Sequence, residues 1–286
     1  MEQHLLKRSR WVLLIYVGYV FLLGACKTPQ YYAHAPSSVN NPFLQKRNDT
    51  RITGNLLLGD GTNTPGVDVQ GAYAITNNLA VAASFTKRFE RDRYRDYDAG
   101  IFGSSDDSGT TRYTRNMTEL AVGYFVPLNE RKSVVVNVFG GAGVGKNILT
   151  DTKRDASNNI VENDYDVPVR KFFVQPSINF IKAKVLSFGV AAKASWIHFG
   201  NANTNFTSQQ LLETGLAKYT NVTRFFFEPA FISQYRFKES GVALNANINF
   251  LAFPNNKNDS YVYETAKVRA ITVSLGATLL LDKFFK

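Results

Sequence analysis

From about residue 51 to the end of the chain, apolar residues alternate with polar or small residues at a period of two. This period is typical of β-strands, because successive side chains of a strand point to opposite faces of a sheet. Within one segment, for example, Leu244 and Ile248 share a face, and Asn245 and Asn247 share the other. The pattern predicts an all-β domain of about ten strands, at 51–59, 66–75, 79–90, 112–126, 133–146, 168–180, 185–198, 219–233, 241–253 and 266–282.

The connections between these predicted strands alternate in length. The short ones lie near 76–78, 127–132, 181–184 and 234–240. The longer ones lie near 60–65, 91–111, 147–167, 199–218 and 254–265. In an up-and-down meander, all tight turns therefore fall at one end and all longer loops at the other. Transmembrane β-barrels have this asymmetry, with short periplasmic turns and longer external loops.

Alternation alone does not say which face is enclosed, and a soluble barrel would bury the apolar one. Three features favour a membrane barrel with a polar lumen: charges and amides that can pair across a narrow interior, small residues on the same face, and aromatic residues such as Trp196 and Phe250 near strand ends. Outer-membrane lipids are then the expected partners. The predicted polar network of the lumen consists of Arg224, Glu228, Lys193, Gln175 and Asn179.

The N-terminus has the form of a bacterial lipoprotein signal. Three basic residues between positions 7 and 10 precede an apolar run at 11–23, which is shorter than the roughly 20 residues that span a bilayer. The run closes with Leu23-Gly24-Ala25-Cys26, which resembles the lipobox. We expect removal of residues 1–25 and a diacylglyceryl group on Cys26, the sole cysteine; an uncleaved anchor helix is the alternative.

Residues 27–50 are polar, carry proline and asparagine, and have no period. We interpret 26–50 as the lipidated cysteine and a flexible tether, and 51–286 as the barrel. The chain has a net charge of +10, of which the signal carries +2, so the mature part carries +8. An exported cationic protein suits anionic headgroups as a partner, and nucleic acid is not expected.

The segment from Val39-Asn40-Asn41-Pro42-Phe43-Leu44 through the stretch from Val69 to Val81 resembles the start of β-barrel lipoproteins from Bacteroidetes-type bacteria. The similarity is best over about residues 20–90 and is architectural beyond that. The resemblance implies a lipobox, a short tether and a small outer-membrane-type barrel in a Gram-negative bacterium. It implies no functional residue.

Residues 139–147 come close to a phosphate-binding P-loop, with Gly140, Gly145 and Lys146 at the required spacing. However, Asn147 stands where Ser or Thr should hold Mg²⁺, and no helix start follows. We favour a glycine-rich barrel strand, in which missing side chains leave room for facing residues. No metal site and no cofactor other than the covalent lipid is expected.

A catalytic site is not expected either. His4 leaves with the signal and His34 lies in the predicted tether, so His198 is the sole candidate base, with Asp106 and Asp107 as candidate carboxylates. Protease barrels would place an acid two residues before such a histidine, where this chain has Trp196.

The sequence therefore predicts a non-enzymatic, lipid-anchored envelope component or an accessory subunit bound to other outer-membrane proteins. Ten strands enclose too little space for a porin, which needs about sixteen. The alternatives are a narrow channel, a surface-binding barrel that contacts glycans or lipopolysaccharide, and, less favoured, an enzyme at the rim. The charged and aromatic stretch at 87–98 suits either headgroup contact or a self-paired hairpin.

Overall fold

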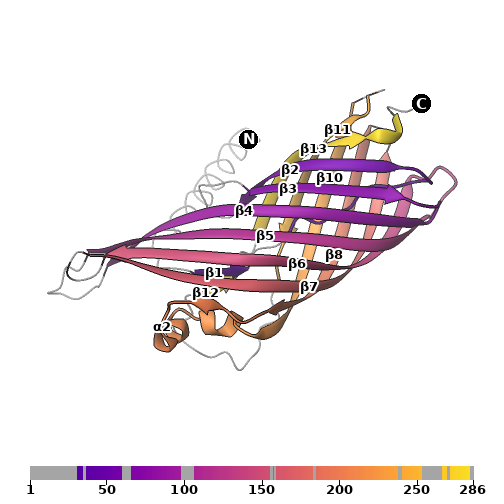
Figure 1. Cartoon of the computed structure of the whole chain (residues 1–286). Coiled ribbons are helices and arrows are strands. Elements are labelled where there is room, and N and C mark those ends of the chain that lie inside the picture. The colour runs from indigo at the N-terminus through magenta and orange to yellow at the C-terminus, as the bar shows by residue number, and fades with distance from the viewer. Residues whose placement is uncertain are drawn as a thin grey trace, which may run out of the picture.

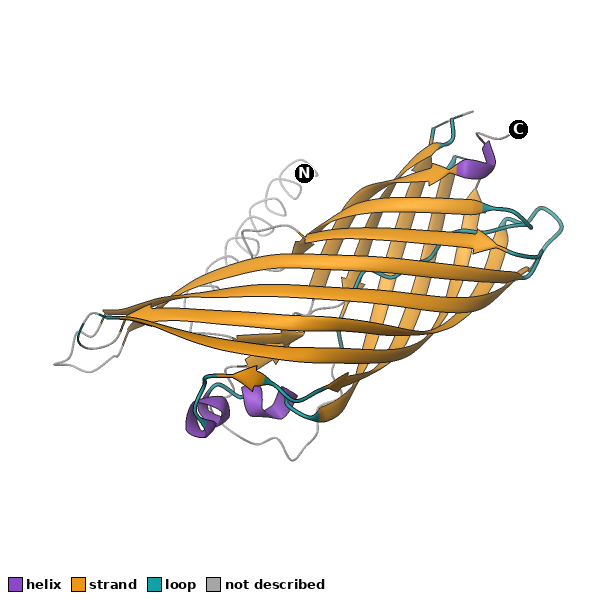
Figure 2. Ribbon diagram, in the orientation of Figure 1, coloured by secondary structure: helices purple, strands orange, loops and turns teal. Residues whose placement is uncertain are grey.

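The computed structural model describes residues 31–34, 37–59, 66–97, 106–154, 157, 159–182, 185–237, 240–252, 266–268 and 271–283. Cys26 and the predicted signal lie outside these residues. The described chain forms a closed antiparallel barrel of ten strands in meander order, as predicted (Figures 1 and 2). The strands are β2 (Thr50–Gly59), β3 (Gly66–Ala74), β4 (Leu79–Tyr97), β5 (Asp106–Pro127), β6 (Val134–Arg154), β7 (Ile160–Lys182), β8 (Leu186–Phe199), β10 (Val222–Arg236), β11 (Val242–Phe250) and β13 (Ile271–Leu280).

The barrel closes where β2 pairs with β13, from Arg51 opposite Leu280 to Gly59 opposite Thr272. The tight turns that follow β3, β5, β7 and β10 lie at one end of the barrel, which we call the short-turn end. The other end, the long-loop end, carries the remaining connections. The four predicted tight turns therefore lie together, as expected, but the connection between β6 and β7 at the other end, residues 155–159, is similar to them in length, so the predicted sorting of loops by length holds only in part.

Two of the predicted long loops are largely strand. The ladder between β4 and β5 continues to Tyr97 opposite Asp106, and that between β6 and β7 continues to Arg154 opposite Ile160. The predicted loops at 91–111 and 147–167 were thus too long. Both faces of a hairpin meet water once it leaves the bilayer, so the apolar alternation ends while backbone pairing continues.

Short elements complete the long-loop end. The connection after β8 holds β9 (Asn203–Thr204), the helix α2 (Ser208–Glu213) and the 3₁₀ helix η1 (Leu216–Tyr219). The last predicted strand divides into β12 (Ala266–Val268) and β13, and a 3₁₀ turn, η2 (Leu281–Lys283), follows. Among the described residues, no helix is long and apolar enough to span a bilayer.

The apolar face of the barrel points outward. On β5, Leu120 is 65% exposed while its neighbour Glu119, which points inward, is only 4% exposed. Exposed apolar side chains encircle the barrel, and water would not favour so large a surface, whereas lipid does. We call this surface the apolar belt; its members include Leu56, Leu58, Val67, Val69, Phe85, Leu120, Val122, Tyr124, Val138, Val144, Phe172, Val174, Phe180, Val190, Trp196, Phe225, Phe231, Leu244, Ile248, Phe250, Ile271, Leu275 and Leu279.

Residues 37–49 do not form the expected flexible tether. They run inside the barrel, where Ser37 is 7% and Phe43 2% exposed, and we call them the plug segment. Ahead of them, β1 (Tyr31–His34) pairs in parallel with β12. The sequence of the plug segment has no strand or helix periodicity because its backbone follows an irregular path. Its polar residues contact polar side chains of the lumen at one depth, and its apolar residues contact apolar side chains at another.

Candidate functional site

Four charged side chains from four strands meet inside the barrel. The ammonium of Lys171 on β7 lies 3.1 Å from Glu119 Oε1 on β5 and 2.9 Å from Glu228 Oε1 on β10, and that of Lys193 on β8 lies 2.6 Å from Glu119 Oε2. All four are almost fully buried. Two positive and two negative groups balance one another here, as burial of charge requires. We call these residues the four-charge cluster.

The plug segment is seated on this cluster at Ser37. Its backbone N–H donates to Glu228 Oε2 at 3.2 Å, and Lys171 Nζ donates to its hydroxyl at 3.0 Å. Ser195 Oγ donates to the other oxygen of Glu228 at 2.7 Å. Lys193 also lies 4.2 Å from the centre of the Phe173 ring. The cluster therefore binds the plug segment to four strands of the barrel, β5, β7, β8 and β10.

Further toward the short-turn end, Asn41 forms a reciprocal amide pair with Asn179. Asn41 Nδ2 donates to Asn179 Oδ1 at 2.6 Å, and Asn179 Nδ2 donates to Asn41 Oδ1 at 2.9 Å. Asn137 Nδ2 also donates to Asn41 Oδ1, at 3.3 Å. Gly189 makes this arrangement possible, because a Cβ there would lie 2.5 Å from Asn179 Oδ1 and 2.6 Å from Asn41 Nδ2.

Wall side chains also satisfy backbone groups of the plug segment. Gln175 Nε2 donates to the carbonyl of Asn40 at 2.9 Å, and the N–H of Val39 donates to Asn249 Oδ1 at 3.1 Å. Irregular chain at membrane depth requires such partners, because no strand ladder satisfies its peptide groups. The asparagine and glutamine residues of the lumen replace that ladder.

An apolar layer fills the short-turn end. Phe43 and Leu44 pack in a buried cluster with small wall residues such as Ala80 and with Phe125 and Phe139. Alanines in the wall leave room for the larger side chains of the plug segment. The segment ends at Asp49, whose carboxylate accepts from the N–H of Gln45 at 2.8 Å. The barrel is therefore closed by close packing at this end.

A second apolar cluster covers the long-loop end. Leu216 and Tyr219 of η1 pack with Phe206 and with strand residues that include Phe199 and Phe226. Tyr165 on β7 donates from its hydroxyl to the carbonyl of Tyr219 at 2.8 Å. The connection with α2 and η1 thus forms a cap, defined here as residues 203–219, on one side of the barrel mouth (Figure 1).

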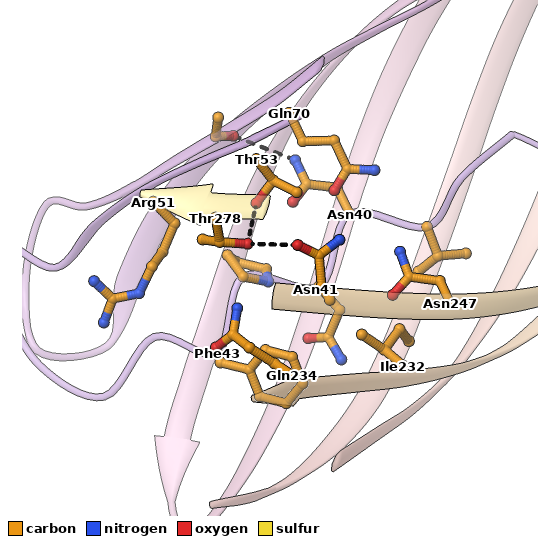
Figure 3. Close-up of a pocket in the computed structure, with 14 residues that line it drawn as sticks. Asn40, Asn41, Phe43, Arg51, Thr53, Gln70, Ile232, Gln234, Asn247 and Thr278 are labelled. Carbon is orange, nitrogen blue, oxygen red and sulfur yellow. Dashed lines mark hydrogen bonds between the residues drawn. The ribbon is translucent and has the colours of Figure 1, made fainter. Parts of the chain in front are cut away.

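A small pocket remains between the plug segment and the wall. Its lining includes Asn40, Asn41 and Phe43 from the plug segment and Gln70 and Asn247 from the strands (Figure 3). Its volume of about 20 Å³ accommodates about one water molecule and no larger solute.

Polar residues on β2 to β5 line another part of the lumen. Asp68 accepts hydrogen bonds from Asn55 at 2.8 Å, Gln70 at 2.7 Å and Thr86 at 2.7 Å. Nearer the long-loop end, Arg115 Nη1 lies 2.8 Å from Glu90 Oε2. Together with the four-charge cluster, these contacts fill the lumen with paired polar side chains, in the space where a channel would hold water.

All five predicted lumen residues lie on inward strand faces, and four of them belong to the four-charge cluster or contact the plug segment. Glu228 and Lys193 belong to the four-charge cluster, and Gln175 and Asn179 contact the plug segment. Arg224 lies apart from them: four residues along β10 from Glu228, or roughly 13 Å at the usual strand rise, it donates to the carbonyl of Lys218 at 3.3 Å.

Sequence reasoning missed Glu119, Lys171 and the whole plug segment. Lys171 lies on the same face of β7 as Gln175, so the alternation that placed Gln175 inside could also have placed Lys171 there. The plug residues carry no such signal. Ser37 contacts Glu228 across 191 positions of sequence, and only the closed barrel brings the two together.

The near P-loop is part of strand β6, as favoured. Gly141 and Gly145 allow close contact with β5 and β7: a Cβ on Gly141 would lie 2.7 Å from Phe173 Cζ, and one on Gly145 would lie 2.1 Å from the carbonyl oxygen of Asn116. Lys146 pairs with Asp166 at 2.6 Å.

His198 is half-buried, and its Nδ1 lies 3.1 Å from Thr223 Oγ1 on the neighbouring strand. Asp106 and Asp107 begin β5, opposite Tyr97 and Asp96 near the tip of the β4–β5 hairpin. Because β6 and β7 separate β5 from β8, the fold does not bring these candidates together. Among the described residues, no group of three or more His, Cys, Asp or Glu is placed to hold a metal ion.

A closed barrel with a lipid-facing apolar belt and a filled lumen is a plugged transmembrane β-barrel. No protein-family model matches the chain, and no curated protein matches it. Among solved structures it is similar to the outer-membrane protease OmpT from Escherichia coli, with 10% identity, a TM-score of 0.44, and coverage of 82% of this chain and 94% of that one. An outer-membrane channel from Pseudomonas putida F1 has 10% identity, a TM-score of 0.37 and coverage of 85% and 100%. The CymD monoaromatic hydrocarbon channel has 8% identity, a TM-score of 0.37 and coverage of 82% and 89%.

Proposed function

We propose that the protein is a lipid-anchored, sealed β-barrel of the outer membrane of a Gram-negative bacterium. It would act without catalysis, as a structural component of the envelope or as an accessory subunit of an outer-membrane complex. The observation that carries this proposal is the plug segment, which is bound at Ser37, Asn41 and Phe43 by side chains from opposite walls. A barrel filled in this way offers surfaces to partners and no path to solutes.

Two surfaces remain available to partners. The apolar belt contacts lipid, and the long-loop end, with its cap and the β4–β5 hairpin, extends beyond the belt. The lipobox-like Leu23-Gly24-Ala25-Cys26 supports a covalent anchor in addition to the barrel. Membrane lipids and other outer-membrane proteins are therefore the proposed partners.

A surface-binding barrel is the second candidate. Loops carry most recognition sites, and the β4–β5 hairpin projects charged and aromatic residues, with Lys87 placed 4.8 Å from the centre of the Phe89 ring. This candidate needs no change in the lumen, whereas a narrow channel would require the plug segment to break its contacts with the four-charge cluster.

Planar-bilayer recording tests the sealed lumen. We expect purified wild-type protein to produce no steady conductance, and a variant that lacks residues 37–44 to produce discrete openings. A variant that lacks residues 98–105 of the β4–β5 connection is the control, since the lumen is unchanged, and should be silent. Reproducible openings of the wild-type protein would contradict the proposal.

The accessory role is tested by capture of the affinity-tagged full chain from mild-detergent extracts, followed by mass spectrometry. We expect a stable companion from the outer membrane that survives a salt wash. The double variant Lys87→Ala/Phe89→Ala separates the two candidates, because a surface-binding barrel should lose glycan or lipopolysaccharide binding while capture of the companion persists.

A further inference from the structure

We infer that the N-terminal chain is threaded through the barrel, so that the residues ahead of Tyr31, Cys26 included, lie on the external face of the membrane. The acyl chains would then enter the outer leaflet. The assignment of the acyl chains to the outer leaflet rests on the lipidation proposed above, whereas the path of the chain through the barrel does not.

One end of the path is fixed at the short-turn end. The N–H of Asn48 donates to the carbonyl of Ala74 at 2.8 Å, and the N–H of Ala74 donates to the carbonyl of Asp49 at 3.0 Å. Ala74 is the last residue of β3, beside the tight turn to β4. The plug segment therefore leaves the lumen at the periplasmic side, if short turns face the periplasm as in other membrane barrels.

The other end of the path is fixed at the opposite boundary of the apolar belt. Ser37 contacts Glu119 and Lys171, whose neighbours Leu120 and Phe172 are the last belt residues of β5 and β7 before polar residues begin. Residues 37–49 thus cover the depth of the belt. Twelve residues reach at most about 40 Å, which is enough for an apolar band of about 25 Å.

The strand β1 continues this path outward. It pairs with β12, Tyr31 opposite Ala266, and β12 directly precedes the point where β13 enters the belt at Ile271. Figure 1 places β1 and β12 at the same end as α2.

The reach of the chain then decides the side on which Cys26 lies. Cys26 precedes Tyr31 by five residues, which span at most about 17 Å. A return to the periplasmic surface would require the chain to cross an apolar band of about 25 Å. A lipid on Cys26 can therefore enter the external leaflet and cannot reach the periplasmic one.

The experiment is labelling of single introduced cysteines in intact cells with a membrane-impermeant maleimide. Thr28→Cys reports on the N-terminal chain, Gln209→Cys in α2 on the long-loop end, and Glu130→Cys on a short turn. We expect Thr28→Cys and Gln209→Cys to react in intact cells, and Glu130→Cys only after the outer membrane is permeabilised. Reaction of each variant in SDS gives the total.

If Thr28→Cys reacts only after permeabilisation, or is protected in both states, the threaded path is overturned. Incorporation of radioactive palmitate is measured on the same cells, with Cys26→Ser as control. If the protein incorporates no palmitate while Thr28→Cys is labelled in intact cells, the proposed anchor is refuted and the threaded path is retained. Palmitate incorporation with Thr28→Cys reactive only after permeabilisation would keep the anchor and refute the path.

Discussion

At the scale of single residues, the buried charges of the lumen are stable only as a set. Lys171→Met would leave Glu119 and Glu228 with Lys193 as their remaining cluster cation. We expect the free energy of unfolding to fall by about 3–5 kcal/mol, because an uncompensated charge would stay buried. The measurement is a urea titration of the folded band, which runs separately from the unfolded chain in cold SDS gels.

Lys146→Met is the matched control for that substitution. Its ion pair with Asp166 is also short, but the lysine side chain is 47% exposed, so the loss should stay below about 1 kcal/mol. Equal losses for the two lysines would show that the four-charge cluster has no special role in stability.

A second substitution addresses the contact between the plug segment and the wall. A Cβ at Gly189 would press on both amides of the Asn41–Asn179 pair, so Gly189→Ala should cost about 1–3 kcal/mol in the same titration. At Gly54, a Cβ would meet nothing within 4 Å, and Gly54→Ala should be close to neutral. A neutral Gly189→Ala would mean that the plug segment is not packed against β8.

At the scale of elements, the strands follow from the sequence wherever one face meets lipid and the other the lumen. Predicted and observed bounds of β2, β3 and β8 differ by about one residue because the two environments impose opposite polarity on successive side chains. The alternation of apolar and polar residues ends where the strands leave the apolar belt, so the extensions of β4 to β7 at the long-loop end could not be predicted. The plug segment could not be predicted either, since its partners are distant in sequence.

The extended β4–β5 hairpin should be dispensable for folding. Asp92 pairs with Thr111, so residues 93–110 can be replaced by Asn-Gly, a sequence that favours a tight hairpin turn. We expect the folded band to persist, with the free energy of unfolding within about 1 kcal/mol of the wild type, because the removed ladder lies outside the belt. Loss of the folded band would place the hairpin in the folding core.

At the scale of the whole molecule, the direction of the apolar face decides what surrounds the barrel. Val122 is 56% exposed on the outward face. In lipid, Val122→Arg should cost about 2–4 kcal/mol, whereas on a water-facing surface it would be close to neutral. Asn116→Arg, on the same face and between Lys87 and Lys146 in the ladder, where the outer surface is already polar, is the control and should cost less than about 1 kcal/mol. Unfolding from lipid bilayers, measured by Trp fluorescence, gives both values.

The seam between β2 and β13 has a consequence for biogenesis. These strands lie at opposite ends of the barrel sequence, so the barrel can close only after β13 has been synthesised and can pair with β2. Asn41 and Phe43 pack against the wall too closely for the plug segment to be inserted into a barrel that has already closed. The plug segment must therefore already lie along the barrel axis while β2 and β13 are still free edges, and any folding catalyst that pairs these two strands must close the sheet around it.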